Sequence, residues 1–361
     1  MFQSPYCALM LIPTGVGARV GGFAGDALPI ARTLSATVDC LVTHPNVLNG
    51  ATLFWPLSNV LYVEGYGLDR FCQGRWNLHP VRQNRVGVIL DAGIEPDLLL
   101  RHQHAIQAAK ATLGLNIVTE IITNSPLGVQ VTAAPSGASC GTLLQPQALL
   151  EAAATAMQLG AEAVAIVARF PDDLNFSDYS QGVGVDPLAG VEAILSHLVV
   201  REFGCPCAHA PALKVEETPT AVSDRAAAEE VGFTFLPSVL AGLSYAPQFV
   251  PPNGPFSGES FSREPSSGGM SSGGLSAGDI DVAIAPATAF GSPALLHLAM
   301  RPKPPLFIAV AENTSVMEVS PQSIGIPAVT VSSYLEAVGL VTAHKAGVSL
   351  KSVLPDRAGI D

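Results

Sequence analysis

Charged residues are scarce in this sequence, and basic ones are scarcest. Only 13% of the 361 residues are charged, about half the usual share, so much of the chain should be buried. The 18 Lys and Arg residues against 30 Asp and Glu residues give a net charge of −12. Nucleic-acid binding needs clustered basic residues that neutralise phosphates, so this balance argues against a nucleic-acid partner. The low charged fraction also suggests surface buried in a homo-oligomer.

Long apolar runs and secretion signals are missing as well. Although 48% of the residues are hydrophobic, no stretch of about 18 uncharged apolar residues occurs, and we expect no membrane-spanning segment. The N-terminus has neither the basic region nor the cleavage site of a signal peptide. Six cysteines in a chain of this length do not form a disulfide framework. These absences predict a protein of a reducing, cytoplasmic compartment.

The apolar runs alternate with segments of helical period, which is the pattern of an α/β protein. Strands are expected at residues 8–13, 40–43, 60–63, 86–91, 116–122, 129–133, 163–168, 282–285, 306–310 and 328–331. Helices are expected at residues 26–38, 96–113, 146–159, 187–200, 223–231, 292–299 and 333–338. The pattern predicts a Rossmann-like, largely parallel sheet with helices on both faces.

One long segment departs from this pattern. Residues 247–278 are rich in Gly, Ser and Pro and show no periodicity, which is typical of a functional loop or a linker. We predict a flexible insertion, with a domain boundary as the alternative. The chain then divides into an α/β body at 1–246, this loop at 247–278, and a C-terminal α/β segment at 279–361 that packs on the same body.

A glycine loop between the first strand and the first helix is the best indication of function. Five glycines fall within eleven residues: Gly15, Gly17, Gly21, Gly22 and Gly25. Backbone amides of such a loop, beside a helix N-terminus, can cradle an anion. The spacing departs from the dinucleotide pattern G-x-G-x-x-G, because Val20 occupies the third position. We therefore predict a small ligand that bears phosphate or carboxylate, and we name no cofactor. Tight packing of the loop without a ligand is the alternative.

Polar residues follow several of the expected strands, at the edge where α/β sheets place their ligand sites. His44, Asn46 and Asn49 follow the second strand, and Glu64 follows the third. We expect His44 and Glu64 to act as acid and base, and the two asparagines to orient the ligand. A turn of satisfied hydrogen-bonding side chains is the alternative for this segment.

The strand at 306–310 is followed by Glu312 and Asn313, which we place at the rim of the same site. Glu312 could equally begin a helix, where its charge would meet the positive end of the helix dipole.

A second loop matches the nucleophile pattern G-x-S-x-G around Ser139. A serine hydrolase built on Ser139 could draw on Asp186 and on His197 or His209, in the chain order Ser, Asp, His. A helix must begin directly after an elbow serine, however, and Pro146 indicates a later start. A ligand-binding loop containing Ser136 and Gly137, or a plain turn, are the alternatives.

A metal site has only weak candidates. Asp172, His197 and His209 are suitable ligand types, but no pair has a recognised spacing such as H-E-x-x-H. We therefore predict no metal.

Several of these segments occur together in one known family. They are residues 21–29, 43–51, 62–65, 135–139, 184–186 and 207–211. On these motifs the chain resembles the cyanobacterial and plastid proteins catalogued as domain of unknown function 3326. The resemblance implies a cytosolic or, in plants, stromal setting and implies no reaction. From the residues we predict a soluble enzyme acting on a small anionic metabolite. A serine hydrolase and a non-catalytic ligand-binding or regulatory module are the alternatives.

Overall fold

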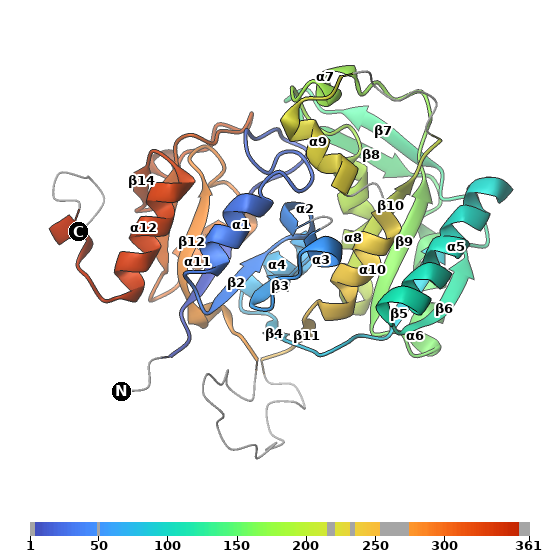
Figure 1. The fold of residues 1–361 in the computed structure, drawn as a ribbon, viewed down its shortest axis with the longest axis horizontal. Coiled ribbons are helices and arrows are strands. Elements are labelled where there is room, and N and C mark those ends of the chain that lie inside the picture. The colour runs from blue at the N-terminus through green and yellow to red at the C-terminus, as the bar shows by residue number, and fades with distance from the viewer. Residues whose placement is uncertain (1–3, 49–50, 215–220, 232–234, 253–273, 354–361) are drawn as a thin grey trace, which may run out of the picture.

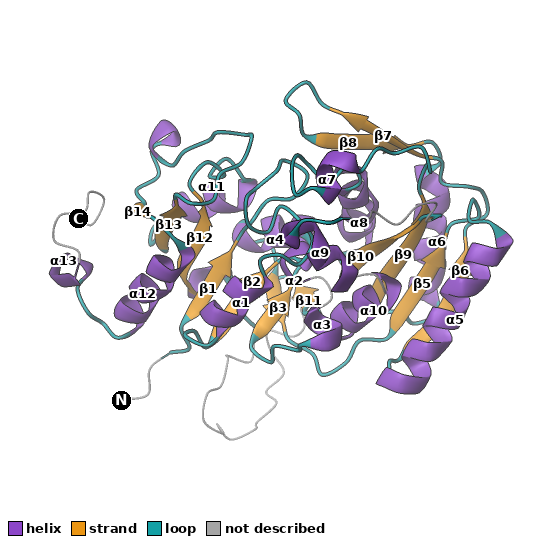
Figure 2. Cartoon of the chain, turned by 45° about the horizontal axis from the view of Figure 1, so that its top comes forward, coloured by secondary structure: helices purple, strands orange, loops and turns teal. Residues whose placement is uncertain are grey.

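The computed structural model describes residues 4–48, 51–214, 221–231, 235–252 and 274–353. Its main strands form two parallel sheets that lie side by side, with helices packed around them (Figures 1 and 2). The α/β prediction is confirmed, and the structure adds that the strands divide between two sheets. Most of the expected flexible insertion, at 253–273, lies outside the described residues.

The first sheet has six strands in the order β14-β13-β12-β1-β2-β3, all parallel. They are β1 (Cys7–Met10), β2 (Cys40–Thr43), β3 (Val60–Tyr62), β12 (Ile280–Pro286), β13 (Leu306–Val310) and β14 (Val329–Val331). The chain runs outward from β1 through β2 and β3, and outward on the other side from β12 through β14. This is the strand order of the Rossmann fold, in which a crevice opens where the order reverses, here between β1 and β12.

The second sheet is formed by residues between β3 and β12. Its order is β10-β9-β5-β6, again all parallel. Its strands are β5 (Val86–Leu90), β6 (Ile117–Ile122), β9 (Ala163–Arg169) and β10 (Cys207–Ala212). Here the order reverses between β5 and β9.

Helices cover both faces of both sheets, which explains why the strands are apolar throughout rather than alternating. Ala8 and Met10 of β1 pack into one core, whereas Cys7 and Leu9 pack into the other. The first core contains residues of α1 (Leu28–Ser35), α5 (Pro96–Leu113), α10 (Phe235–Tyr245) and α12 (Tyr334–Lys345). The second contains residues of α4 (Gly65–Cys72), α6 (Pro146–Gln158), α8 (Ala189–Phe203) and α11 (Pro293–Ala299). Because each core includes strands from both sheets, the two sheets share their hydrophobic interior.

Shorter elements complete the structure. A hairpin of β7 (Val129–Ala133) and β8 (Ser139–Leu143) projects beside the second sheet (Figure 2). The others are α2 (Pro45–Leu48), α3 (Ala51–Phe54), α7 (Ser177–Ser180), α9 (Asp224–Val231), α13 (Leu350–Val353) and an antiparallel pair of β4 (Asn77–His79) with β11 (Gln248–Val250). Within the part of the chain that the structure describes, no helix is both long and apolar enough to cross a membrane.

Candidate functional site

A cavity of about 1260 Å³ lies between the two sheets. Its walls include the segments that follow β1, β2 and β3 of the first sheet, the loop after β9 and the end of β10 of the second. Helices α4, α5, α8, α9, α10 and α11 and the short α7 also contribute lining residues. The carboxyl ends of parallel strands are where α/β proteins bind ligands, and here those ends converge from two sheets. The cavity is therefore the candidate site.

Helix α8 forms one wall of the cavity. Ala189, Ala193 and His197 recur every four residues, as do Glu192 and Ser196, so they share one side of the helix. Just before the helix, the Asp186 carboxylate accepts a hydrogen bond of 2.8 Å from the Leu188 backbone N–H. The strand β10 adds His209 beside this wall.

Glu64 and His197 form an ion pair across the cavity wall. Oε1 of Glu64 lies 2.8 Å from Nε2 of His197. The other oxygen, Oε2, caps helix α4 by accepting hydrogen bonds from the backbone N–H groups of Tyr66 and Gly67, at 2.9 and 3.2 Å. The Glu64 side chain is 5% exposed and that of His197 is 43% exposed. A buried, fixed carboxylate thus holds an imidazole that remains open to the cavity.

This pairing changes the protonation of His197. Burial lowers the pKa of the imidazole, but the hydrogen bond and charge of Glu64, aided by Asp69, outweigh burial and raise the pKa above its ordinary value. An ordinary histidine has a pKa of about 6.5. His197 is therefore suited to give or accept a proton near neutral pH.

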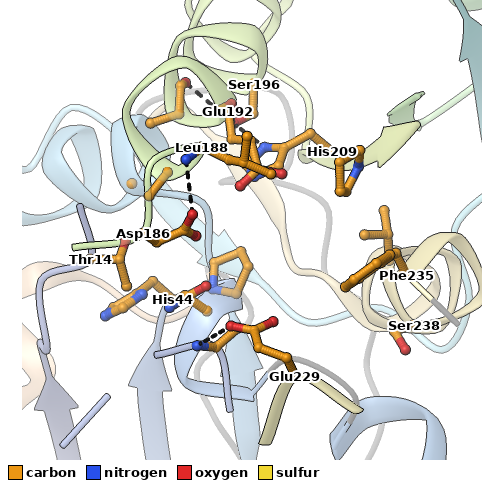
Figure 3. Close-up of a pocket in the computed structure, with 18 of the residues that line it drawn as sticks. Thr14, His44, Asp186, Leu188, Glu192, Ser196, His209, Glu229, Phe235 and Ser238 are labelled. Carbon is orange, nitrogen blue, oxygen red and sulfur yellow. Dashed lines mark hydrogen bonds and ion pairs between the residues drawn. The ribbon is translucent and has the colours of Figure 1, made fainter. Parts of the chain in front are cut away.

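Three further carboxyl groups enter the same cavity, as Figure 3 shows: Asp186 and Glu192 from one side and Glu229 of α9 from the other. Burial raises the pKa of Asp186 to about 6. Burial, reinforced by the charge of Asp186, raises that of Glu229 to about 7. The pKa of Glu192 lies well above its usual range, through burial and then the charges of Asp186 and Glu229. Part of this group is consequently protonated at neutral pH.

Two histidines of the cavity are neutral. Burial lowers the pKa of His44 to about 4, and its Nε2 accepts a hydrogen bond of 3.1 Å from the Ile12 N–H. The neutral ring therefore carries its proton on Nδ1. Burial, with the charge of His197, lowers the pKa of His209 to about 4. Nδ1 of His209 lies 3.1 Å from the Ser196 hydroxyl, and its Nε2 lies 3.7 Å from Glu192.

The glycine loop contributes structure rather than an open cradle of amides. The Val20 N–H donates to the Asn313 side chain at 3.0 Å, the Gly21 N–H donates to the Asp26 carboxylate, and the Ala24 N–H donates to Glu229 at 3.0 Å. These three amides are thus engaged by the protein's own oxygen atoms. A Cβ at Gly22 would lie 2.3 Å from the Ala18 carbonyl oxygen, so glycine is needed there for packing. The contacts favour the alternative in which the loop packs tightly without a ligand.

The other glycines of the loop allow backbone conformations that other residues rarely adopt. Gly15, Gly17, Gly21 and Gly25 all have positive φ angles, between 67° and 79°, which glycine adopts without steric cost.

The residues after β13 hold this loop and do not line the cavity. Asn313 is fully buried, and its side-chain amide donates to the Val20 carbonyl and to the Tyr334 hydroxyl, both at 2.8 Å. Glu312 accepts a hydrogen bond of 2.7 Å from the Tyr334 N–H at the start of α12. Both therefore have structural roles. Asn46 does line the cavity, whereas Asn49 lies outside the described residues.

The hairpin corrects the expected nucleophile elbow. Ser139 is the first residue of β8, paired with Ala133, and the next helix begins only at Pro146. An elbow requires a strand, a sharp turn and then a helix, and that geometry is absent at Ser139. Instead, the Ser139 hydroxyl accepts a hydrogen bond of 2.8 Å from the Gly190 N–H, which fastens the hairpin to α8.

Ser136 and Gly137 lie at the tip of this hairpin. Neither is among the described residues that line the cavity.

The three weak metal candidates have separate partners. The carboxylate of Asp172 accepts from Arg169 at 2.5 and 2.7 Å, while His197 pairs with Glu64 and His209 with Ser196. Across the described ranges, no group of three or more His, Cys, Asp and Glu side chains is placed to hold a metal ion.

The sequence patterns did not mark Glu229, Tyr62 or Glu192 as candidate site residues, although all three line the cavity. The spacing of Glu192 and Ser196, one helical turn apart, could have indicated their shared face. No local signal indicates Glu229, because its place depends on how α9 packs against the glycine loop. Its carboxylate accepts from the Tyr179 hydroxyl at 2.5 Å as well as from Ala24.

Comparison with known proteins gives a family and no activity. No solved structure matches the chain. An uncharacterized lipoprotein of the cyanobacterium Synechococcus sp. is 50% identical over 351 residues, which cover 96% of this chain and 93% of that protein. The family described as "Protein of unknown function (DUF3326)" matches residues 7–354. The resemblance stated from the motifs is confirmed, and the chain belongs to the DUF3326 family of proteins of unknown function.

Proposed function

We propose that this protein is an enzyme that performs acid–base chemistry on a small polar metabolite held between its two sheets. The observation that carries the proposal is the Glu64–His197 pair, with 2.8 Å between Oε1 and Nε2. The capping bonds of Glu64 fix the carboxylate before any substrate binds. Such prior fixation of a catalytic group is what efficient proton transfer requires.

His197 is the proposed proton donor and acceptor. Because Glu64 holds its Nε2, the nitrogen available to a substrate is Nδ1, which forms no hydrogen bond with any residue in the described part of the chain. Histidine is the side chain that most often transfers protons in enzymes, and Glu64 raises the pKa of His197 above its ordinary value.

Two other groups of the cavity differ from His197 in protonation: Glu192 is a protonated acid and His44 is a neutral ring. Glu192 is a carboxylic acid that can donate a proton, because its pKa is raised well above the usual range. His44 is a neutral ring whose Nδ1–H can donate a hydrogen bond that orients a substrate. Active sites commonly combine titratable groups whose surroundings drive their pKa values apart.

We further propose a reducing compartment such as the cytosol. All six cysteines are unpaired, and five of them are buried. Free buried thiols fit a compartment in which disulfides do not persist.

The proposal is tested by profiling a metabolite extract before and after incubation with the purified protein. We expect the wild-type protein to consume particular metabolites and to generate products. Ala193→Phe, which fills the cavity from α8, should abolish these changes. Ala108→Phe, at an exposed position of α5 outside the cavity lining, should not. Identical changes with Ala193→Phe would place the activity elsewhere, and metabolites bound but never consumed would indicate a non-catalytic binding module.

A further inference from the structure

The described lining of the cavity carries far more acidic than basic side chains. Seven carboxyl residues line it: Glu64, Asp69, Asp97, Asp172, Asp186, Glu192 and Glu229. The described lining contains two residues of the Lys and Arg types, Arg101 and Lys214. The Lys214 ammonium is matched by Glu95, 2.6 Å away and outside the lining, just as Asp172 is matched by Arg169 and Glu64 by His197. Of the seven carboxyl residues, the other five remain against Arg101. The cavity therefore favours a ligand of positive charge.

The inner carboxyl groups have no strong cationic partner among the described residues. Asp186 accepts from a backbone N–H, and Glu229 accepts from a backbone N–H and a phenol. The basic side chain beside Glu192 is His209, whose Nε2 lies 3.7 Å from Oε2 of Glu192, and that ring is neutral. Arg225 of α9 is directed elsewhere, with its Nε 3.6 Å from Asp26. Buried carboxyl groups are usually paired or hydrogen-bonded to donors, and a donor on the ligand would complete these.

Tyr62 provides a second and independent indication of a ligand. It lies at the carboxyl end of β3, lines the cavity, and is only 7% exposed. Its hydroxyl forms no hydrogen bond with any residue that the structure describes. The residue is largely buried but the hydroxyl oxygen is not fully buried, so it is accessible from the cavity. Its ring also lies against α10, where a Cβ on Gly242 would come within 2.8 Å of it. The ring is thus held in place, with an oxygen that a ligand can satisfy.

We propose that the ligand of this cavity is a small organic cation with an ammonium or guanidinium group that Asp186, Glu192 and Glu229 receive. Tyr62 offers a further acceptor in the same cavity. A cation beside these acids favours their charged forms, so Glu192, protonated in the free protein, releases its proton when the ligand binds. The inference rests on the proposed function for its location and goes beyond it in naming the ligand class. A bare metal ion does not fit, because the described acids are not grouped closely enough to hold one. An organic cation with several N–H donors can reach carboxylates that are spread apart.

Titration calorimetry with matched small molecules tests this inference. Putrescine and agmatine carry the predicted groups, butanediol has the putrescine skeleton without charge, and succinate carries negative charge. We expect putrescine or agmatine to bind and butanediol and succinate not to bind. Glu192→Gln should weaken amine binding at least about tenfold, a loss of about 1.4 kcal/mol. Glu202→Gln, an exposed position on the same helix, should leave the affinity unchanged.

The outcomes also separate this inference from the proposed function. His197→Asn should retain amine affinity while turnover is lost, and Tyr62→Phe should weaken amine binding several-fold without loss of folding. Turnover of neutral or anionic metabolites, with amine binding absent or insensitive to Glu192→Gln, would overturn the inference and leave the enzyme proposal intact. Amine binding that depends on Glu192, without any turnover, would support the inference and count against the enzyme. Binding of succinate but of no amine would restore the anionic ligand expected from the glycine loop and overturn the inference.

Discussion

Replacing His197 with asparagine should reduce kcat for the metabolite that the wild-type protein consumes by about a hundredfold to ten-thousandfold. This is the usual contribution of a positioned general acid or base. Asparagine does not reach the position of Nε2, so the titratable group and its contact with Glu64 are both lost, while the bonds from Glu64 to the start of α4 remain. Because the role is proton transfer rather than binding, KM should change little. The measurement is steady-state kinetics on the metabolite found by profiling.

The control for this variant is His297→Asn. His297 lies on α11, is exposed, and bonds only to the Pro293 carbonyl of its own helix among the contacts described. We expect this variant to retain full activity. A fall of less than about fivefold in His197→Asn, or an equal fall in both variants, would contradict the assigned role.

Gly190→Ala should lower the free energy of unfolding by about 3 kcal/mol or more, at the upper end of overpacking effects. A Cβ at residue 190 would lie 2.1 Å from the Ser139 carbonyl oxygen and 2.5 Å from its carbonyl carbon. Both are backbone atoms of the hairpin, which cannot rotate away as a side chain can. The change would also break the bond from the Gly190 N–H to the Ser139 hydroxyl. Urea unfolding of purified protein measures the loss, and failure to obtain folded protein agrees with it.

The matched control is Gly339→Ala, in α12. A Cβ added at Gly339 would meet no heavy atom of a neighbouring segment within 4 Å, and the φ angle of this residue is not positive. Alanine should therefore stabilise the helix by about 0.5–1 kcal/mol. If Gly190→Ala were as stable as wild type, the close packing of the hairpin on α8 would be wrong. Because α8 carries Glu192 and His197, the placement of these two side chains in the cavity wall would then also be wrong.

Much of the fold was predictable because its elements have strong local signals. Pro96 and Pro146 begin α5 and α6 as expected for first-turn prolines. The apolar run at 40–43 forms β2 with the predicted ends.

Among the elements that were missed, helix α10 and strand β10 have ambiguous local signals. Helix α10 is almost wholly apolar and contains Pro237, and periodicity cannot separate such a buried helix from a strand. Strand β10 has the sequence CAHAPA, which lacks the β-branched residues that usually mark strands.

The candidate site was predictable only in part. His44, Asn46 and Glu64 were found because polar residues after buried strands fall at one edge of a sheet. The pairing of Glu64 with His197 spans two sheets, and no pattern along the chain specifies it. The glycine loop was predicted to leave its amides open to an anion. The Val20 and Ala24 amides are engaged instead by Asn313 and Glu229, which lie hundreds of residues away in sequence and therefore give no local signal.

Whether Glu64 holds His197 and raises its pKa can be measured by NMR titration of the His197 imidazole in the free protein. No substrate is needed. We predict a pKa above the ordinary value of about 6.5 in the wild type and a lower pKa in Glu64→Gln, because glutamine removes the charge that outweighs burial. The amide oxygen of glutamine can still cap α4, so the fold should persist. The same His197 pKa in both proteins would show that Glu64 does not raise the pKa of His197.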